Sequence, residues 1–382
     1  MATVHIFSVA RRRRASGFSL IELMVGVAIG LIGILVMFQM FALWDSHTRS
    51  TTAGGDAQVS GTLAMFNMER DVKAAGFGFG AASSPFMGCN VQANDVSPPR
   101  AFNFPLRPVT ITVGAGGAPD QISILYGNSS FFESQEVLES STGSTKTMRR
   151  RGGFRPGDLA VVAGDPTGVP GAATCVLVEI TDTSSPDNKT VGHAAGSYSS
   201  YYSATASGPR FNTGAGAGAA FTGGSVYSLG PFPQLNTWRV AGGKVLTRDD
   251  VIHGTPAFEV AEGVINLKAQ YGIDADANGQ ITAAEWTTVA PVDWTRVLAV
   301  RAAILVRSNQ FERRADPNAG APTGVTPVAP AWAGGAFVMT NVDGTADSFT
   351  INQSDPNNWR YYRYRVYEKV IPLRNMIWGT AP

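Results

Sequence analysis

Hydrophobic residues along this chain begin as one nearly unbroken run. From Phe18 to Trp44 almost every position is apolar, and Glu22 and Gln39 are the strongly polar exceptions. As a helix, at about 1.5 Å per residue, the run is roughly 40 Å long, which exceeds the ~30 Å hydrocarbon core of a bilayer. Residues 18–44 are therefore predicted to form a membrane-spanning helix.

The hydrophobic spacing next becomes that of an amphipathic helix. Between Asp56 and Ala75, apolar residues recur near helical intervals with charged residues between them. These apolar residues are Val59, Leu63, Phe66, Met68 and Val72. The pair Gly54–Gly55 is a candidate bend, and Gly76 starts a glycine-rich stretch of the kind that ends helices. Residues 45–76 are thus expected to continue the helix and to pack on a globular head.

From residue 77 to residue 382, short apolar segments separated by turn residues predict an antiparallel β-sheet. The predicted strands are Val109–Val113, Gln121–Tyr126, Leu159–Ala163, Cys175–Thr181, Ser225–Leu229, Trp238–Val240, Lys244–Thr247, Val264–Ile273, Arg296–Arg307 and Arg360–Pro372. Residues 194–224 and 315–336 are expected to be long surface loops, the first with little core of its own. The fold class is α+β, with a long N-terminal helix on a large β-rich head.

Charges at the N-terminus predict the orientation of the helix. Arg11–Arg14 precede the apolar run, and the first 21 residues contain no acid. This bias places the N-terminus in the cytoplasm and everything after Asp45 outside the inner membrane. Small residues ending in Gly17 follow the arginines, so a cut there removes the charges and keeps the helix, unlike cleavage of a secretory signal. Residues 1–17 are predicted to be a cleaved basic leader.

Composition bounds the function of the exported part. The 382-residue chain has a formal charge of +1, and the leader holds four arginines and no acid, so the mature charge is −3, from +1 minus 4. No general attraction to nucleic acid follows, and Arg149–Arg151 is either a phosphate contact or a solvated basic turn. The four histidines lack metal-ligand spacing and no Gly-x-Ser-x-Gly motif is present, so no catalytic site is predicted.

Glu22 is a carboxylate inside an apolar helix. An ionised carboxylate at that depth costs several kcal/mol unless a partner compensates it. Cleavage after Gly17 creates such a partner, the α-amino group of Phe18, in the same chain or in a neighbouring helix. The alternative is that Glu22 lies at headgroup depth and is solvated.

The segment Gly17-Phe18-Ser19-Leu20-Ile21-Glu22-Leu23 resembles the cleavage and methylation site of type IV prepilins and type II secretion pseudopilins. The resemblance implies that a membrane aspartic peptidase cuts after Gly17 and methylates the nitrogen of Phe18. It also implies that Glu22 serves subunit recruitment and register in a filament. Four further segments resemble PilW-like minor pilins: 70–77, 156–159, 262–272 and 373–375.

This resemblance implies a pilin-like fold and a minor pilin in or near the tip or priming complex that starts a type IV pilus. The implied partners are other minor pilins and the major pilin through the N-terminal helix, the prepilin peptidase, the inner-membrane assembly platform and a tip adhesin. The protein is then expected in the inner membrane first and in the extracellular filament afterwards. The alternatives are a tip pseudopilin of a type II secretion system and, with no supporting site, an anchored periplasmic binding protein or enzyme.

Two cysteines, Cys89 and Cys175, lie in the exported region. In an oxidising periplasm, the simplest interpretation is a disulfide that closes a long loop. The alternative is two unrelated buried thiols, because the geometry of a bridge cannot be judged from spacing alone.

One constellation has the spacing of a twelve-residue calcium loop. Asp274, Asp276 and Asn278 occupy positions 1, 3 and 5, Gly279 follows at the turn, and Glu285 stands at position 12. Position 7, which supplies a backbone carbonyl, is Gln280. The residues before the loop alternate like a strand rather than an EF-hand helix, so the alternative is an acidic turn without metal. A structural Ca²⁺ ion is the expectation.

Overall fold

The computed structural model describes residues 17–80, 82, 86–130, 135–164, 174–214, 217–314, 323–339 and 358–379. The chain divides into two compact units, residues 1–52 and residues 53–382, which we describe separately. Residues 1–16 of the predicted leader and residues 315–322 of the second predicted loop lie outside the described residues.

Helix α1, Leu20–Ala74, belongs partly to each unit, and the second unit ends with helix α2, Arg374–Gly379. Gly54–Gly55 does not interrupt α1, contrary to the candidate bend. Gly76 follows the helix at φ +80°, and its N–H donates to the carbonyl of Leu125 at 2.9 Å. The predicted helix end is therefore confirmed, because only glycine adopts this backbone conformation readily.

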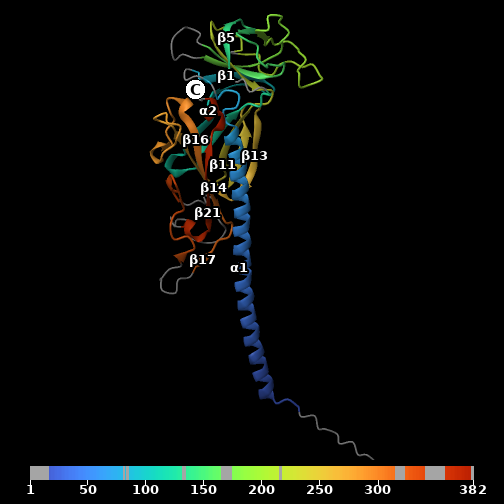
Figure 1. The fold of residues 1–382 in the computed structure, drawn as a ribbon. Helices are drawn as coiled ribbons and strands as arrows, with labels where there is room; N and C mark the ends of the chain where they lie inside the picture. Colours follow the sequence, from blue (N-terminus) through green and yellow to red (C-terminus); the bar gives the residue numbers. More distant parts are fainter. Residues whose placement is uncertain are drawn as a thin grey trace, which may run out of the picture. The chain divides into compact units, whose positions relative to one another are not determined.

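The second unit is built from short strands (Figure 1). The longer strands are β1 Asn90–Val96, β2 Pro99–Pro105, β3 Val109–Thr112, β4 Gln121–Tyr126, β5 Glu136–Ser141, β6 Thr145–Met148, β7 Leu159–Gly164, β8 Thr174–Glu179, β9 Thr190–Gly192, β10 Gly224–Gly230, β11 Gln234–Ala241, β12 Val245–Asp250, β13 Thr255–Glu262, β14 Val264–Ile273, β16 Val297–Arg307 and β21 Tyr364–Pro372. The two-residue strands are β15 Trp286–Thr287, β17 Arg313–Arg314, β18 Thr323–Gly324, β19 Ala331–Trp332 and β20 Gly335–Ala336. The 3₁₀ helices are η1 Ala115–Gly117, η2 Ala283–Glu285, η3 Trp294–Arg296 and η4 Asn358–Tyr361.

The strands pair into three main sheets. Their orders are β2-β1-β8-β7-β10-β5-β6-β9, β13-β12-β11-β4-β3 and β15-β14-β16-β21. Strands β17–β18 and β19–β20 form two small hairpins. In the described part of the chain β1 and β8 pair in parallel, and the other strand pairs, such as β14 with β16, are antiparallel. The predicted α+β class with a largely antiparallel head is confirmed.

The predicted strands overlap observed strands, but several observed strands were not predicted. Strands β1, β2, β5, β6, β9 and β13 were missed. Their sequences are polar or carry proline, as in the exposed strand β13, so hydrophobic alternation is weak there. The predicted strand Arg360–Pro372 starts too early, because residues 358–361 form η4 and β21 begins only at Tyr364.

The predicted long loop 194–224 is also corrected. Phe211 and Phe221 are buried in the hydrophobic cores of the head, and Ala217 is also buried. Exposed residues such as Tyr201 precede them, and strand β10 begins at Gly224. The segment is thus a surface loop only in its first half, because its later apolar side chains anchor it to the core.

The eight-stranded sheet separates two hydrophobic cores. On strand β7, Val161 faces the main core, whereas Val162 faces a smaller core that also contains Val178 and Val226. Successive side chains of a strand point to opposite faces, so both faces of the central strands are covered. This explains why every residue of β7 is buried.

A disulfide joins Cys89 and Cys175, whose Cα atoms are 6.1 Å apart. Cys89 precedes β1, and Cys175 lies on β8 opposite Val91 in the parallel pairing of these strands. The bridge therefore ties two neighbouring strands that are separated by 86 residues in the chain. The predicted disulfide is confirmed.

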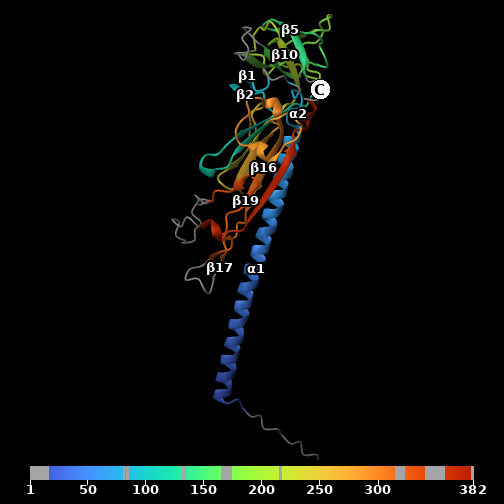
Figure 2. The same ribbon diagram turned by 60° about the vertical axis from the view of Figure 1, so that its left-hand side comes forward.

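Within the second unit, strand β21 lies beside helix α1 (Figure 2). A Cβ atom on Gly61 would lie 2.1 Å from Cε2 of Tyr367, so this contact requires glycine. The hydroxyl of Tyr367 donates to the carbonyl of Gln58 at 3.2 Å. Lys369 pairs with Glu69 at 2.5 Å, and this hydrogen bond lowers the pKa of the Glu69 carboxyl. The helix is thus fixed to the four-stranded sheet by close packing and polar contacts.

Asp71 fixes the same helix to the five-stranded sheet. It is 1% exposed, and its carboxylate accepts hydrogen bonds from Tyr126 on β4 at 3.2 Å and from Asn236 and Trp238 on β11 at 3.0 Å each. Arg248 on β12 forms an ion pair with it at 3.3 Å. Burial, followed by the charge of Asp71, raises the pKa of Tyr126, which stays a neutral donor. One carboxylate therefore joins α1 to three strands.

Candidate functional site

The predicted processing site lies just before helix α1. Gly17 has open space where a Cβ would be placed, and Phe18 is 86% exposed. The leader is still attached in this chain, so the nitrogen of Phe18 is a peptide nitrogen. The backbone here is accessible to a peptidase.

Ser19 and Glu22 form a reciprocal cap at the start of α1. The N–H of Glu22 donates to Oγ of Ser19 at 3.2 Å, and the N–H of Ser19 donates to Oε2 of Glu22 at 3.4 Å. This is a capping box, whose sequence signal is Ser-x-x-Glu. The sequence interpretation overlooked that signal, although it was present. Glu22 therefore has a backbone partner within its own chain before any cleavage.

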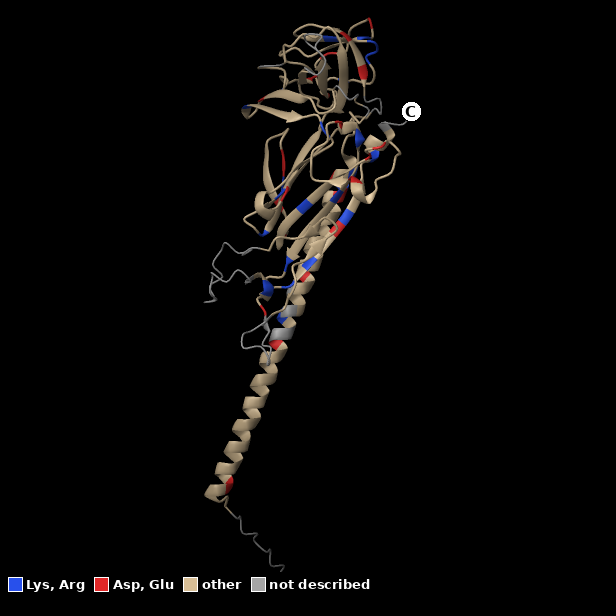
Figure 3. Ribbon diagram, turned by 90° about the vertical axis from the view of Figure 1, so that its left-hand side faces the viewer, with Lys and Arg blue, Asp and Glu red and all other residues tan. Residues whose placement is uncertain are grey.

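The apolar part of α1 is exposed throughout. Residues Leu20–Asp45 are long and apolar enough to cross a membrane by length and composition. In Figure 3 the ribbon of this stretch is tan between its ends, the colour of residues other than Lys, Arg, Asp and Glu. Together with the motif at Gly17, this helix fits an anchor in the inner membrane.

The head-side half of α1 has two apolar faces. Met68 and Val72 lie in the main core, as predicted, but Val59, Leu63 and Phe66 are 69%, 49% and 61% exposed. Successive helical residues are about 100° apart, so these three side chains form a stripe opposite the buried face. The sequence interpretation had placed all five on one face. We call Val59, Leu63 and Phe66 the outer stripe.

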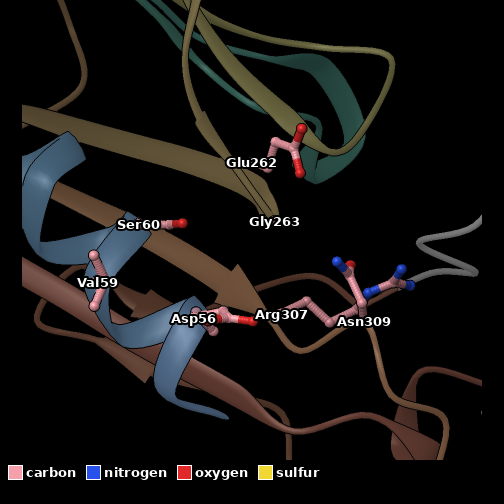
Figure 4. Close-up of a pocket in the computed structure, with 8 residues that line it drawn as sticks. Asp56, Val59, Ser60, Glu262, Gly263, Arg307 and Asn309 are labelled. Atoms are coloured by element: carbon pink, nitrogen blue, oxygen red, sulfur yellow. The ribbon is translucent and has the colours of Figure 1, made fainter. Parts of the chain in front are cut away.

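A cavity of about 380 Å³ adjoins the outer stripe at Val59. Figure 4 shows Asp56 and Ser60 on α1 at one side of it, and Asn309 beyond the end of β16 at another. Glu262, at the turn between β13 and β14, lies across from them. Polar side chains of α1, of the β13–β14 turn and of the segment after β16 thus lie beside the outer stripe.

The candidate calcium loop connects β14 to η2 and β15. Asp274 is buried, and its two carboxylate oxygens accept the N–H groups of Asn278 at 3.0 Å and Gly279 at 2.9 Å. Oε1 of Glu285 accepts the N–H of Ala275 at 2.9 Å. Backbone hydrogen bonds from Thr282, the largest cause, lower the pKa of Glu285. Backbone N–H groups of the loop therefore orient the carboxylates of Asp274 and Glu285.

The spacing of these carboxylates fits one calcium ion. Ligand atoms of Asp274, Asp276 and Glu285 all lie within 4.8 Å of one another. Two oxygens bound to the same Ca²⁺ at 2.3–2.6 Å are at most about 5 Å apart. Asn278 is less well placed, because its Oδ1 accepts the N–H of Gln280 at 2.7 Å and its amide donates to Asp276. The loop follows strand β14, as the alternating residues before it indicated, and it ends in the 3₁₀ helix η2.

The histidines and the Arg149–Arg151 turn lie in different environments. His193 is buried, and His253 pairs with Asp250 at 2.5 Å. Arg149 and Arg150 are exposed, whereas Arg151 donates to the carbonyl of Thr183.

Comparisons with known families match two parts of this chain. Residues 12–38 match the prokaryotic N-terminal methylation motif. Residues 246–375, from strand β12 to the start of helix α2, match type IV pilus-assembly protein W. No curated protein and no solved structure matches the chain.

These matches confirm the resemblance to PilW-like pilus proteins. They support a type IV pilus-related, minor-pilin-like protein, and they point to a structural pilus component rather than to an enzyme. The first match covers the processing site and the apolar helix, and the second covers the four-stranded sheet and the candidate calcium loop.

Proposed function

We propose that this minor-pilin-like protein joins a type IV pilus in or near the tip or priming complex that initiates the filament. The observation that carries the proposal is the outer stripe of Val59, Leu63 and Phe66. Among the described residues, these three side chains lie outside the main hydrophobic core and on the opposite face of the helix. They fit burial against the apolar helix of a neighbouring subunit.

The size of the head supports a special position rather than a repeated one. Residues 53–382 form one unit with three main sheets. A head of this size is harder to repeat along a shaft than a small one. We therefore assign the subunit to a filament end, together with other minor pilins.

Leu63→Glu tests the outer stripe. The variant is expected to fold with a free energy of unfolding within about 0.5 kcal/mol of the wild type, because Leu63 is half exposed on the helix surface. It should be processed and inserted, yet be nearly absent from sheared filaments when detected by immunoblotting. Immunogold labelling of wild-type filaments should place the protein at filament ends.

Val292→Glu is the matched control, because Val292 is a fully exposed apolar residue outside the stripe. It should enter filaments as the wild type does. Normal incorporation of Leu63→Glu would remove the role of the stripe, and label along the whole shaft would remove the tip assignment. Recovery of secretion pseudopilins instead of pilins after crosslinking in membranes would favour the secretion alternative.

We also propose that the loop from Asp274 to Glu285 binds a structural Ca²⁺ ion. Calorimetric titration of the full-length protein with calcium chloride should show a heat of binding. The melting temperature of the protein should be higher in calcium than in a chelator. At 100 times the dissociation constant, the expected stabilisation is about 2.7 kcal/mol. Asp276→Ala should abolish both effects.

Asp187→Ala is the control for calcium, because Asp187 is also an exposed turn aspartate that accepts N–H groups of its own loop, from Lys189 at 2.9 Å and Thr190 at 3.0 Å. This variant should respond to calcium as the wild type does. Absence of heat and of a melting shift in the wild type would make the loop a plain turn.

A further inference from the structure

A second cavity, of about 230 Å³, lies beside strands β7 and β8 of the eight-stranded sheet. Its walls come from the start of β7, the end of β8, the segment 198–211, the turn between β10 and β11, and His253 after β12. Its volume is below the roughly 300–1,000 Å³ of pockets for drug-sized ligands, so it suits a single small ring.

Aromatic side chains form much of this wall. Tyr198, Tyr202, Phe211 and Phe232 line the cavity. Phe211 is buried, whereas Phe232 is 59% exposed and offers a ring surface to solvent. The segment that carries the two tyrosines is rich in serine, tyrosine and glycine, a composition found in binding loops that combine rigid aromatic contacts with hydroxyl groups.

Hydrogen bonds hold the tyrosines in place. The hydroxyl of Tyr202 donates to Asp158 at 2.7 Å, and the hydroxyl of Tyr198 donates to Glu179. Both rings are therefore oriented before a ligand arrives, which lowers the entropy cost of binding.

The charged groups of the wall are already compensated by protein atoms. The guanidinium of Arg210 binds both carboxylate oxygens of Asp95, at 2.6 and 2.7 Å, and donates to the carbonyl of His253 at 2.9 Å. Glu179 accepts the N–H of Arg210 at 2.6 Å and the hydroxyl of Tyr198. Because the protein already supplies the hydrogen-bond partners of both groups, neither is left free to pair with a charged ligand.

Two polar groups of the wall remain available. Nδ1 of His253 faces Oδ2 of Asp250 at 2.5 Å, so Nε2 is the ring nitrogen that is left for a ligand. Within the described residues, neither this Nε2 nor the hydroxyl of Ser207 makes a hydrogen bond. Ser207 adds a donor and an acceptor at the edge of the cavity.

We propose that this cavity binds one neutral pyranose ring of a glycan. Such a ring has C–H faces that stack on aromatic rings, such as that of Phe232, and hydroxyl groups that pair with His253 and Ser207. Its lack of charge matches the compensated charges of the wall. The inference is independent of incorporation into a filament.

Saturation-transfer NMR on the full-length chain, in a detergent without sugar headgroups, tests this proposal. The probes are the methyl glycosides of glucose, galactose, mannose, N-acetylglucosamine and N-acetylgalactosamine, each at about 10 mM to detect millimolar binding. At least one should receive saturation at its ring protons. Phe232→Ala should weaken its binding about tenfold, which corresponds to about 1.4 kcal/mol.

Tyr201→Ala is the matched control, because Tyr201 is 62% exposed but does not line the cavity. It should bind the same glycoside as the wild type does. The main chain of residue 232 keeps its hydrogen bond to Asn128 in the Phe232→Ala variant, so the fold is retained. The proposal is overturned if no glycoside receives saturation, if Phe232→Ala binds unchanged, or if choline or acetate displaces the sugar.

Discussion

Replacement of Asp71 by alanine is expected to lower the free energy of unfolding of the head by about 3–5 kcal/mol. The variant leaves the cation of Arg248 without its partner and three buried donors without their acceptor, on Tyr126, Asn236 and Trp238. Unpaired buried donors cost about 1–3 kcal/mol each, and these costs are not additive. Urea unfolding of the full chain in detergent, followed by tryptophan fluorescence, measures the loss.

Glu139→Ala provides the control for Asp71. It breaks the exposed ion pair with Lys189, whose N–O distance is 3.5 Å, and should change stability by less than about 1 kcal/mol. Asp71→Asn, which keeps the shape and one acceptor oxygen, should lie between the wild type and Asp71→Ala. A loss below about 1 kcal/mol in Asp71→Ala would show that Asp71 does not hold the helix to the sheet.

Replacement of Glu22 by alanine is expected to abolish incorporation into filaments while leaving cleavage and membrane insertion intact. The variant loses both the reciprocal cap with Ser19 and the negative charge that is predicted to pair with the cleaved amine of Phe18. Mass spectrometry of the mature N-terminus reports cleavage and methylation, and immunoblots of sheared filaments report incorporation.

Glu22→Gln separates the two roles, because glutamine can also serve in a capping box but carries no charge. If pairing with the amine governs assembly, Glu22→Gln should fail as Glu22→Ala does. Normal incorporation of Glu22→Gln would contradict the pairing. Gly17→Ala is the processing control and should accumulate uncut, although Gly17 has room for a methyl group and the helix itself is unaffected.

The long helix was predictable because its evidence is local. An unbroken apolar run, the helical spacing after it and the glycine at position 76 each act within a few turns of the chain. The faces of the head-side half were not predictable in the same way. Val59, Leu63 and Phe66 are as apolar as Met68 and Val72, and only the position of the sheets decides which of them is buried.

The strands also divide into those that the local sequence predicts and those that it does not. Strands β4 and β14 coincide with their predicted bounds because both are hydrophobic. Strands β1 and β2 have weak apolar patterns. They pair with each other as a hairpin, and β1 also pairs with β8, which lies in a distant part of the chain. Contacts of that kind leave little trace in local periodicity.

The two candidate sites likewise differ in whether the sequence alone can reveal them. The loop from Asp274 to Glu285 is a continuous motif, so its residues were found from spacing, and folding brought three of its carboxylates together. The cavity at Phe232 unites residues from distant segments, including Glu179 and His253, and spacing could not reveal it.

The sequence by itself determined the apolar helix, the processing motif, the candidate calcium loop and the α+β class, because each depends on neighbouring residues or on composition. Only the tertiary structure decided that Asp71 is the polar centre between helix and sheet, that Cys89, just before β1, lies next to Cys175 on β8, and that α1 keeps a second apolar face. The physical reason is that burial and pairing depend on which distant surfaces meet, and one stretch of sequence does not specify its partner.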